Sequence, residues 1–109
     1  MKVEKKFTKA QWIVDGRLVY ALHQTGWRKG QPELSNRFWA NVQGDHNITP
    51  SELEANAKLI ASAPELLDAL IELVEVKEWK DKHGKDEHYN NAMPIAWKNA
   101  KQAIEKATK

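Results

Sequence analysis

The sequence predicts an α+β fold in which a small antiparallel sheet of about three strands is followed by three helices packed on one of its faces. A change of pattern supports this. Apolar residues alternate within residues 1–47, whereas they recur every three or four positions within 48–109. A length of 109 residues suits one core, so 1–109 is expected to form a single domain with a β-rich part and a helical part.

An Asp-Gly pair at residues 15 and 16 predicts a tight hairpin, because this dipeptide favours a type I′ turn. With both residues in the turn, Val14 opposes Arg17 and the side chains sort into two faces. One face then carries Ile13, Leu18, Tyr20 and Leu22, and the other carries Trp12, Val14, Arg17, Val19 and Ala21. Because the second face includes a charge, we expect it to be the less buried one.

The following segment, 24–36, contains two Gly and one Pro without sustained alternation, which indicates a long loop. Loops of this length without internal structure are uncommon unless they bind something or are mobile, so Trp27, Arg28 and Lys29 are of interest. Residues 37–43 alternate again and predict a half-buried strand that turns Trp39 away from the core.

Three helices are expected after residue 48. Thr49-Pro50-Ser51-Glu52 has the pattern of a capping box, and the helix that it opens should run until Pro64 breaks it. The second helix should end near Gly84, and its many apolar residues predict burial on much of its circumference. The third is predicted from about Met93 to Lys106, and the alternative is a helix that begins near Asp86 and kinks at Pro94. Its packing seam would be Met93, Trp97, Ala100, Ile104 and Ala107.

The net charge of +2 conceals a division into three parts. Residues 1–47 hold eight Lys or Arg against four acids, 48–81 hold three against eight, and 82–109 hold six against three. This division does not provide the continuous basic surface of a duplex DNA binder, but it suits an acidic helix beside basic neighbours in one molecule or across an oligomer. With no cysteine, no apolar run of about 20 residues and a polar start, the sequence predicts a soluble protein without disulfides or membrane spans.

Sequence motifs of catalysis are missing. The chain has no P-loop, no dinucleotide fingerprint and no Gly-x-Ser-x-Gly, so we expect a protein that is not an enzyme and uses no cofactor. His83 and His88 are the best metal-ligand pair, but five positions on a helix would turn them apart. No metal site is therefore predicted.

Five Trp in 109 residues are the most informative feature. Flat rings beside guanidinium groups suit stacking on a base or nucleotide, or anchoring a protein interface. We predict a binding surface on the sheet side that carries Trp12 and Trp39. Its residues would be Trp12, Arg17, Trp27, Arg28, Arg37 and Trp39. In the alternative interpretation the helices cover this side and the Trp residues belong to the core.

The segment Ala55–Leu70, ANAKLIASAPELLDAL, resembles a motif of many small uncharacterised bacteriophage and prophage proteins, Ala-Asn-Ala-x-Leu-Ile-Ala-x-Ala-Pro-Glu-Leu-Leu-x-Ala-Leu. In those proteins Thr-Pro-Gly-Pro-Trp often opens a β-rich segment, and Thr8–Trp12 stands at the matching place here without the Pro or Gly. Ala103–Ala107 also resembles the family's end. The resemblance implies a phage origin and an architecture, and it marks no catalytic residue.

This resemblance implies an accessory protein in the cytoplasm of the bacterial host. The expected function is to bind, and so inhibit or sequester, a host component as a means of evading defence. The target would be a host protein gripped by the acidic helices or a small nucleotide signal held by Trp and Arg, and the helical region would be the site of any homo-oligomer. The alternative is a single-stranded nucleic-acid-binding module, which the acidic middle part disfavours.

Overall fold

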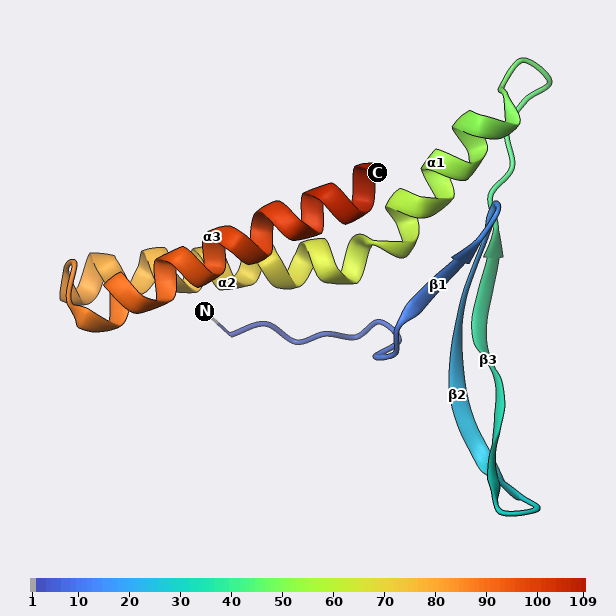
Figure 1. Cartoon of the computed structure of the whole chain (residues 1–109), viewed down its shortest axis with the longest axis horizontal. Coiled ribbons are helices and arrows are strands. Elements are labelled where there is room, and N and C mark those ends of the chain that lie inside the picture. Colours follow the sequence, from blue (N-terminus) through green and yellow to red (C-terminus); the bar gives the residue numbers. More distant parts are fainter. Residues whose placement is uncertain (1) are drawn as a thin grey trace. The chain divides into compact units, whose positions relative to one another are not determined.

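A computed structural model describes residues 2–109 (Figure 1). It confirms a three-stranded antiparallel sheet followed by three helices. The elements are β1 (Trp12–Asp15), β2 (Leu18–Arg28), β3 (Gln31–Asn41), α1 (Pro50–Ala61), α2 (Ala63–His83) and α3 (Glu87–Thr108). The chain divides into two compact units, of which one is Glu4–Ala61 and the other holds Ser62–Lys109 with Lys2 and Val3. The first helix thus belongs with the sheet.

The β1–β2 turn consists of Gly16 and Arg17, one residue later than expected. Gly16 has a φ of 61° and Arg17 has no positive φ, which fits a type II′ turn with glycine first. Val14 therefore pairs with Val19, and its predicted pairing with Arg17 is wrong. Because each partner moves by two positions, the side chains that remain in the strands keep their predicted faces, whereas Arg17 moves into the turn.

The core lies on the face that the sequence analysis expected to be less buried, so that expectation is wrong. Val19 and Ala21 are fully buried there, and α1 packs against β1 and β2 with Leu53 buried. Trp12 shares this face and is half-buried. The reason is the turn: Arg17 leaves the strand, so the face keeps only apolar residues.

Beyond β1, the strands β2 and β3 continue as a two-stranded ribbon (Figure 1). The predicted loop over 24–36 is therefore wrong. Pro32 is tolerated because β3 is an edge strand, and Gly26 follows an irregularity in the pairing. Lys29 and Gly30, both with positive φ, form the turn at the tip.

The predicted first helix and its break are confirmed. The backbone N–H of Glu52 donates to Thr49 Oγ1 at 3.2 Å, which caps α1. A turn at Ser62 separates α1 from α2, and Pro64 occupies the first turn of α2, where a missing N–H costs nothing.

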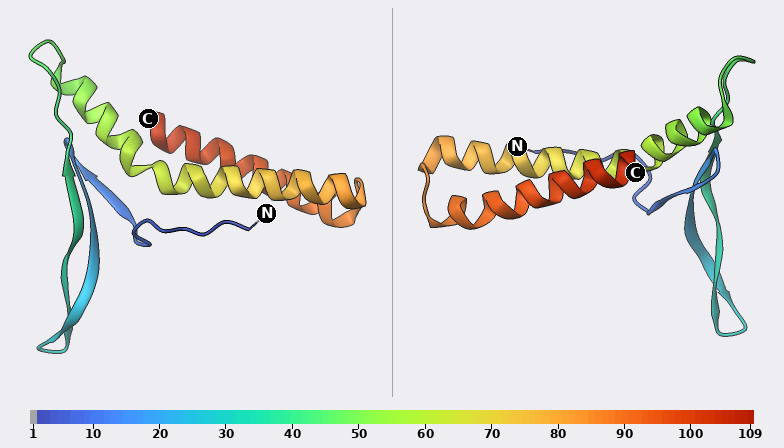
Figure 2. Two further views of the ribbon diagram at one scale, coloured as in Figure 1. Left: turned by 180° about the vertical axis from the view of Figure 1, so that it is seen from behind. Right: turned by 45° about the horizontal axis from the view of Figure 1, so that its top comes forward.

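The helices α2 and α3 lie side by side as a hairpin (Figures 1 and 2). Gly84, with a φ of 74°, ends α2 as predicted. The start near Met93 is wrong and the alternative near Asp86 is confirmed, because the Asp86 carboxylate accepts a hydrogen bond from the Tyr89 N–H at 2.9 Å and caps the helix. Among residues 2–109, no helix has both the length and the apolar character needed to cross a membrane.

Small residues form the contact between α2 and α3. The buried positions are Ala69 and Val76 on α2 and Ala96, Ala103 and Ala107 on α3. The predicted seam is wrong at its two large members, since Trp97 is 56% exposed and Ile104 58%. The expected burial of α2 on much of its circumference is also wrong, because Leu70 is 60% exposed. Alanine allows the close approach of two helix backbones, so the larger residues are left outside the contact.

Candidate functional site

An open pocket of about 340 Å³ lies in the sheet-containing unit, between the N-terminal segment and the β2–β3 ribbon. Its lining joins two parts of the chain that are distant in sequence. The lining residues are Lys6, Phe7, Thr8, Lys9, Ala10, His23 and Arg37. The volume lies at the lower end of the range of small-molecule sites, about 300–1,000 Å³.

Arg37 reaches this pocket through a β-bulge. Ala21 pairs with Phe38 and Leu22 with Asn36, so Arg37 is an extra residue in β3 without an opposite partner. Bulges bend a strand and redirect a side chain, and here the redirected side chain lines the pocket with His23. His23 Nε2 lies 3.2 Å from Ser35 Oγ, which orients the imidazole.

Trp12 holds the N-terminal wall in place. Its indole N–H donates to the Thr8 carbonyl at 3.2 Å, and its ring meets Phe7 edge-on at 6.1 Å and Phe38 at 4.9 Å. The small side chain of Ala21, paired with both Trp12 and Phe38, leaves room for these rings to meet. The floor of the pocket is thus continuous with the core.

The charge of the pocket has one sign. Lys6, Lys9 and Arg37 are cationic, and none of the described residues that line it is acidic. Arg and Lys side chains around a half-buried aromatic ring, here Phe7, suit an anion attached to a flat group.

The structure does not bring the six predicted binding residues together. Arg37 lines the pocket and Trp12 supports it from the core. Trp39 pairs with Tyr20 on the opposite face of the sheet from Trp12, so the prediction that both share one side is wrong, although Trp39 is 67% exposed as expected. The exposed residue Arg17 stands in the β1–β2 turn.

The remaining two predicted residues lie at the tip of the ribbon. Trp27 is 71% exposed and pairs with Pro32, and Arg28 precedes the turn. Lys29 adjoins them with a φ of 52°, a conformation that a lysine seldom adopts.

Sequence reasoning missed three further polar residues that line the pocket. Lys6, Lys9 and His23 belong to no periodic apolar pattern, and a bulge leaves no signal in a single sequence. The one available sign was the basic run around an aromatic residue at 5–9, Lys-Lys-Phe-Thr-Lys.

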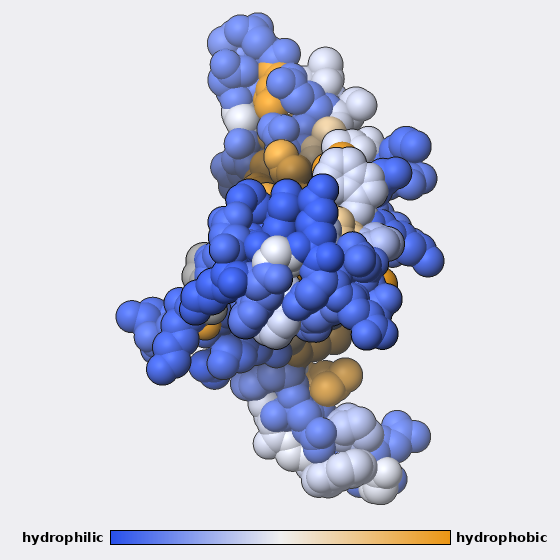
Figure 3. Space-filling view, turned by 90° about the vertical axis from the view of Figure 1, so that its left-hand side faces the viewer, coloured by the Kyte–Doolittle hydropathy of each residue, from blue (hydrophilic) through white to orange (hydrophobic). Residues whose placement is uncertain are grey.

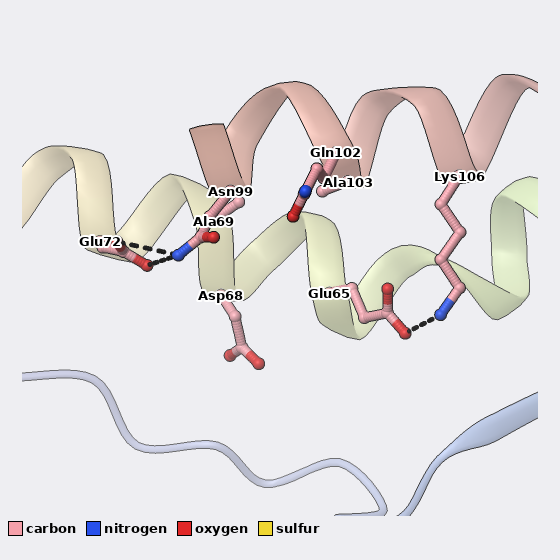
Figure 4. A pocket seen from close by; sticks show the side chains of 8 residues that line it. All are labelled: Glu65, Asp68, Ala69, Glu72, Asn99, Gln102, Ala103 and Lys106. Atoms are coloured by element: carbon pink, nitrogen blue, oxygen red, sulfur yellow. Dashed lines mark hydrogen bonds and ion pairs between the residues drawn. The ribbon is translucent and has the colours of Figure 1, made fainter. Parts of the chain in front are cut away.

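A second open pocket, of about 330 Å³, lies on one flank of the α2–α3 hairpin (Figure 4). Asn99 Nδ2 donates to both carboxylate oxygens of Glu72 at 3.3 Å, and Lys106 Nζ lies 2.6 Å from Glu65 Oε1. Acidic residues of α2 thus stabilise the hairpin itself.

At the turn of this hairpin, whose exposed end is hydrophilic in Figure 3, Trp79 lies between His83 and His88 at 4.1 Å from each ring. The expectation that these histidines face apart is wrong, because the turn brings α3 back onto Trp79. Hydrogen bonds from the Tyr89 N–H and then from the Trp79 indole lower the pKa of the Asp86 carboxyl below its ordinary 3.8. Within residues 2–109, no group of three or more His, Cys, Asp or Glu is placed to hold a metal ion.

Comparison with curated proteins finds no match, and neither does comparison with solved structures. One family model matches residues 1–109, the whole chain, and its description is Salmonella phage P22 protein Y8K6. This confirms the phage origin that the resemblance implied. The chain belongs to the Salmonella phage P22 protein Y8K6 family.

Proposed function

We propose that this phage protein is a non-enzymatic accessory protein that binds and sequesters a small nucleotide signal in the cytoplasm of the bacterial host, and so blunts a defence response. The pocket lined by Lys6, Lys9, Arg37, His23 and Phe7 is the observation that carries the proposal. Its cations would hold phosphate oxygens, and the half-buried ring of Phe7 would lie against the base. The size of the pocket favours a ligand with one nucleotide unit.

Trp12 provides a built-in reporter of binding, because its indole contacts the carbonyl of Thr8 and the ring of Phe7, and both residues line the pocket. Titration with cyclic and linear mononucleotides is therefore expected to change the Trp emission. The change should disappear in Trp12→Phe. Calorimetry should still detect the ligand, but with a lower affinity, because this variant also loses the hydrogen bond that holds Thr8. An emission change that survives this substitution would place the ligand elsewhere.

Arg37→Ala should weaken nucleotide binding about tenfold to a hundredfold, because a charge-assisted hydrogen bond contributes about 1.5–3 kcal/mol. The measurement is isothermal titration calorimetry. Arg17→Ala is the matched control: it removes an exposed arginine of the same unit that lies outside the pocket, and it should bind like the unsubstituted protein. Equal affinities of the two variants, or no heat with any nucleotide, would refute the proposal.

A second candidate function is single-stranded nucleic-acid binding, and the tip of the ribbon favours it. Trp27 combines 71% exposure with the neighbouring cations Arg28 and Lys29. Exposed indoles stack on bases of any sequence, and adjacent cations hold the backbone.

Trp27→Ala is expected to weaken binding of a single-stranded oligonucleotide by about 1–3 kcal/mol in a fluorescence anisotropy assay. Affinity should also fall steeply as salt rises from about 50 to 200 mM. Trp39→Ala removes an indole of similar exposure from the three-stranded part of the sheet, away from the tip of the ribbon, and should have little effect. An oligonucleotide affinity that does not change with salt concentration, or that is the same in Trp27→Ala, would exclude this function.

A further inference from the structure

The helix α3 carries two apolar stripes, and α2 covers only one of them. The covered stripe consists of alanines, including Ala96 and Ala103. The other stripe is Met93, Trp97, Ala100 and Ile104, at alternating steps of four and three residues. Trp97 and Ile104 are more than half exposed in this second stripe.

The helix α2 repeats the arrangement. Ala69 and Val76 are buried toward α3, whereas Leu66, Leu70 and Leu73 follow steps of four and three, and Leu70 is 60% exposed. Since each helical residue advances by about 100°, Leu70 lies on the side of α2 opposite Glu65, Asp68 and Glu72, which line the polar pocket. The half-buried Leu66 and Leu73 lie between that side and the contact with α3.

The two uncovered stripes lie on one surface. Asn99, Gln102 and Lys106 of α3 line the same polar pocket as the acids of α2, so this pocket marks one flank of the hairpin (Figure 4). By the same angular argument, Trp97 and Ile104 lie on the side of α3 away from it. We call this opposite surface, which Leu70, Val74, Trp97 and Ile104 dominate, the apolar flank.

We propose that two copies of the chain pair through their apolar flanks to form a four-helix bundle. Spacing of four and three residues is the repeat with which helices of such bundles interlock. A surface that carries one such stripe on each of two antiparallel helices matches a second copy of itself across a two-fold axis.

The area of the flank meets the requirement of a stable dimer. Leu70, Val74, Trp97 and Ile104 are 60%, 40%, 56% and 58% exposed. An aromatic side chain such as Trp97 has on the order of 150–250 Å² of surface and the aliphatic ones have less, so these fractions leave roughly 300–400 Å² of apolar surface per copy. With a polar rim in the usual proportion, about 60% apolar, the interface would bury roughly 500–700 Å² per copy, which reaches the ~600 Å² per partner of the smaller standard complexes.

Charge disfavours a lipid surface as the occupant. The hairpin of α2 and α3, residues 63–108, carries nine acidic residues against seven lysines and so has no cationic excess. Helices that lie on anionic membranes have the opposite balance, with Lys and Arg on the polar face. A second copy brings no such conflict.

The test is sedimentation velocity of the full chain over a range of concentrations. We expect a species of twice 12.5 kDa. Ile104→Glu places a charge in the interface and should raise the dimer dissociation constant about a hundredfold or more. Gln102→Glu, an exposed position two residues away on the pocket flank, is the matched control and should remain dimeric.

Trp97→Ala is a second test in case Ile104→Glu does not fold, because it shortens an exposed side chain without adding a charge. It should raise the dimer dissociation constant about tenfold and leave the helical circular dichroism signal unchanged. A chain that sediments as a monomer at every concentration, or a dimer that Ile104→Glu leaves intact, would overturn the proposal. The inference does not depend on the basic pocket, so Arg37→Ala should leave the dimer unchanged.

Discussion

Leu53→Ala is expected to lower the free energy of unfolding by about 2–5 kcal/mol, the range for truncating a buried leucine. Leu53 is 5% exposed on α1, which packs against β1 and β2, and its truncation leaves a cavity in this core. Urea denaturation followed by circular dichroism measures the change.

Leu59→Ala is the control for this prediction. Leu59 lies on the same helix and is 52% exposed, so an identical truncation there should cost less than about 1 kcal/mol. Equal effects at the two positions would mean that α1 does not cover the sheet through Leu53.

Trp79→Ala should destabilise the helical hairpin by about 3 kcal/mol, the lower end of the range for truncating a buried Trp, since Trp79 is only half-buried. Its ring contacts His83 on α2 and His88 on α3, and its N–H donates to both Asp86 oxygens at 3.0 Å. One side chain therefore joins both helices to the helix cap. Urea denaturation by circular dichroism again gives the value, and Trp39→Ala, at 67% exposure, should have almost no effect.

Trp79→Phe separates the ring contacts from the hydrogen bond. It should cost less than the alanine variant and should show a distinct pH dependence. The folded-state pKa of Asp86 is lowered, so the stability that this carboxylate contributes is present above its unfolded value and is lost as pH falls through the folded one. The difference between the unsubstituted protein and Trp79→Phe should therefore shrink below about pH 3.8. A difference that is constant with pH would contradict a role for the indole in holding the ionised Asp86.

The sequence predicted the order and type of the elements because their signals are local. Thr49 and Pro50 mark the start of α1, and Gly84 marks the end of α2. The face that forms the core was not predictable in this way. The turn forms one residue later than expected, so Arg17 leaves one face and Asp15 joins the strand on the other, opposite Leu18. The charge therefore changes sides, and α1 packs against β1 and β2 of the hairpin that results.

The helical seam was misassigned for a related reason. Periodicity favours large apolar residues such as Trp97 and Ile104, but two helices approach most closely through small ones such as Ala96 and Ala103. When a helix carries two apolar stripes with the same spacing, periodicity alone does not show which stripe packs against the other helix of the chain.

The candidate site was predictable at one residue, Arg37. The prediction grouped arginines with tryptophans by their position along the strands, whereas the pocket arises where the polar N-terminal segment meets a redirected side chain. The prediction placed Trp12 in the binding surface. In the structure Trp12 instead supports the N-terminal wall of the pocket through its hydrogen bond to the Thr8 carbonyl.

The bulge in β3 has an evolutionary consequence. Arg37 is surplus to the ladder, since its neighbours on either side pair with consecutive residues of β2. A relative that lost this single codon would keep an unbroken ladder and the same scaffold, yet it would lack the arginine that lines the pocket with His23. Under the proposed function, the scaffold and the choice of ligand would therefore depend on different residues of β3.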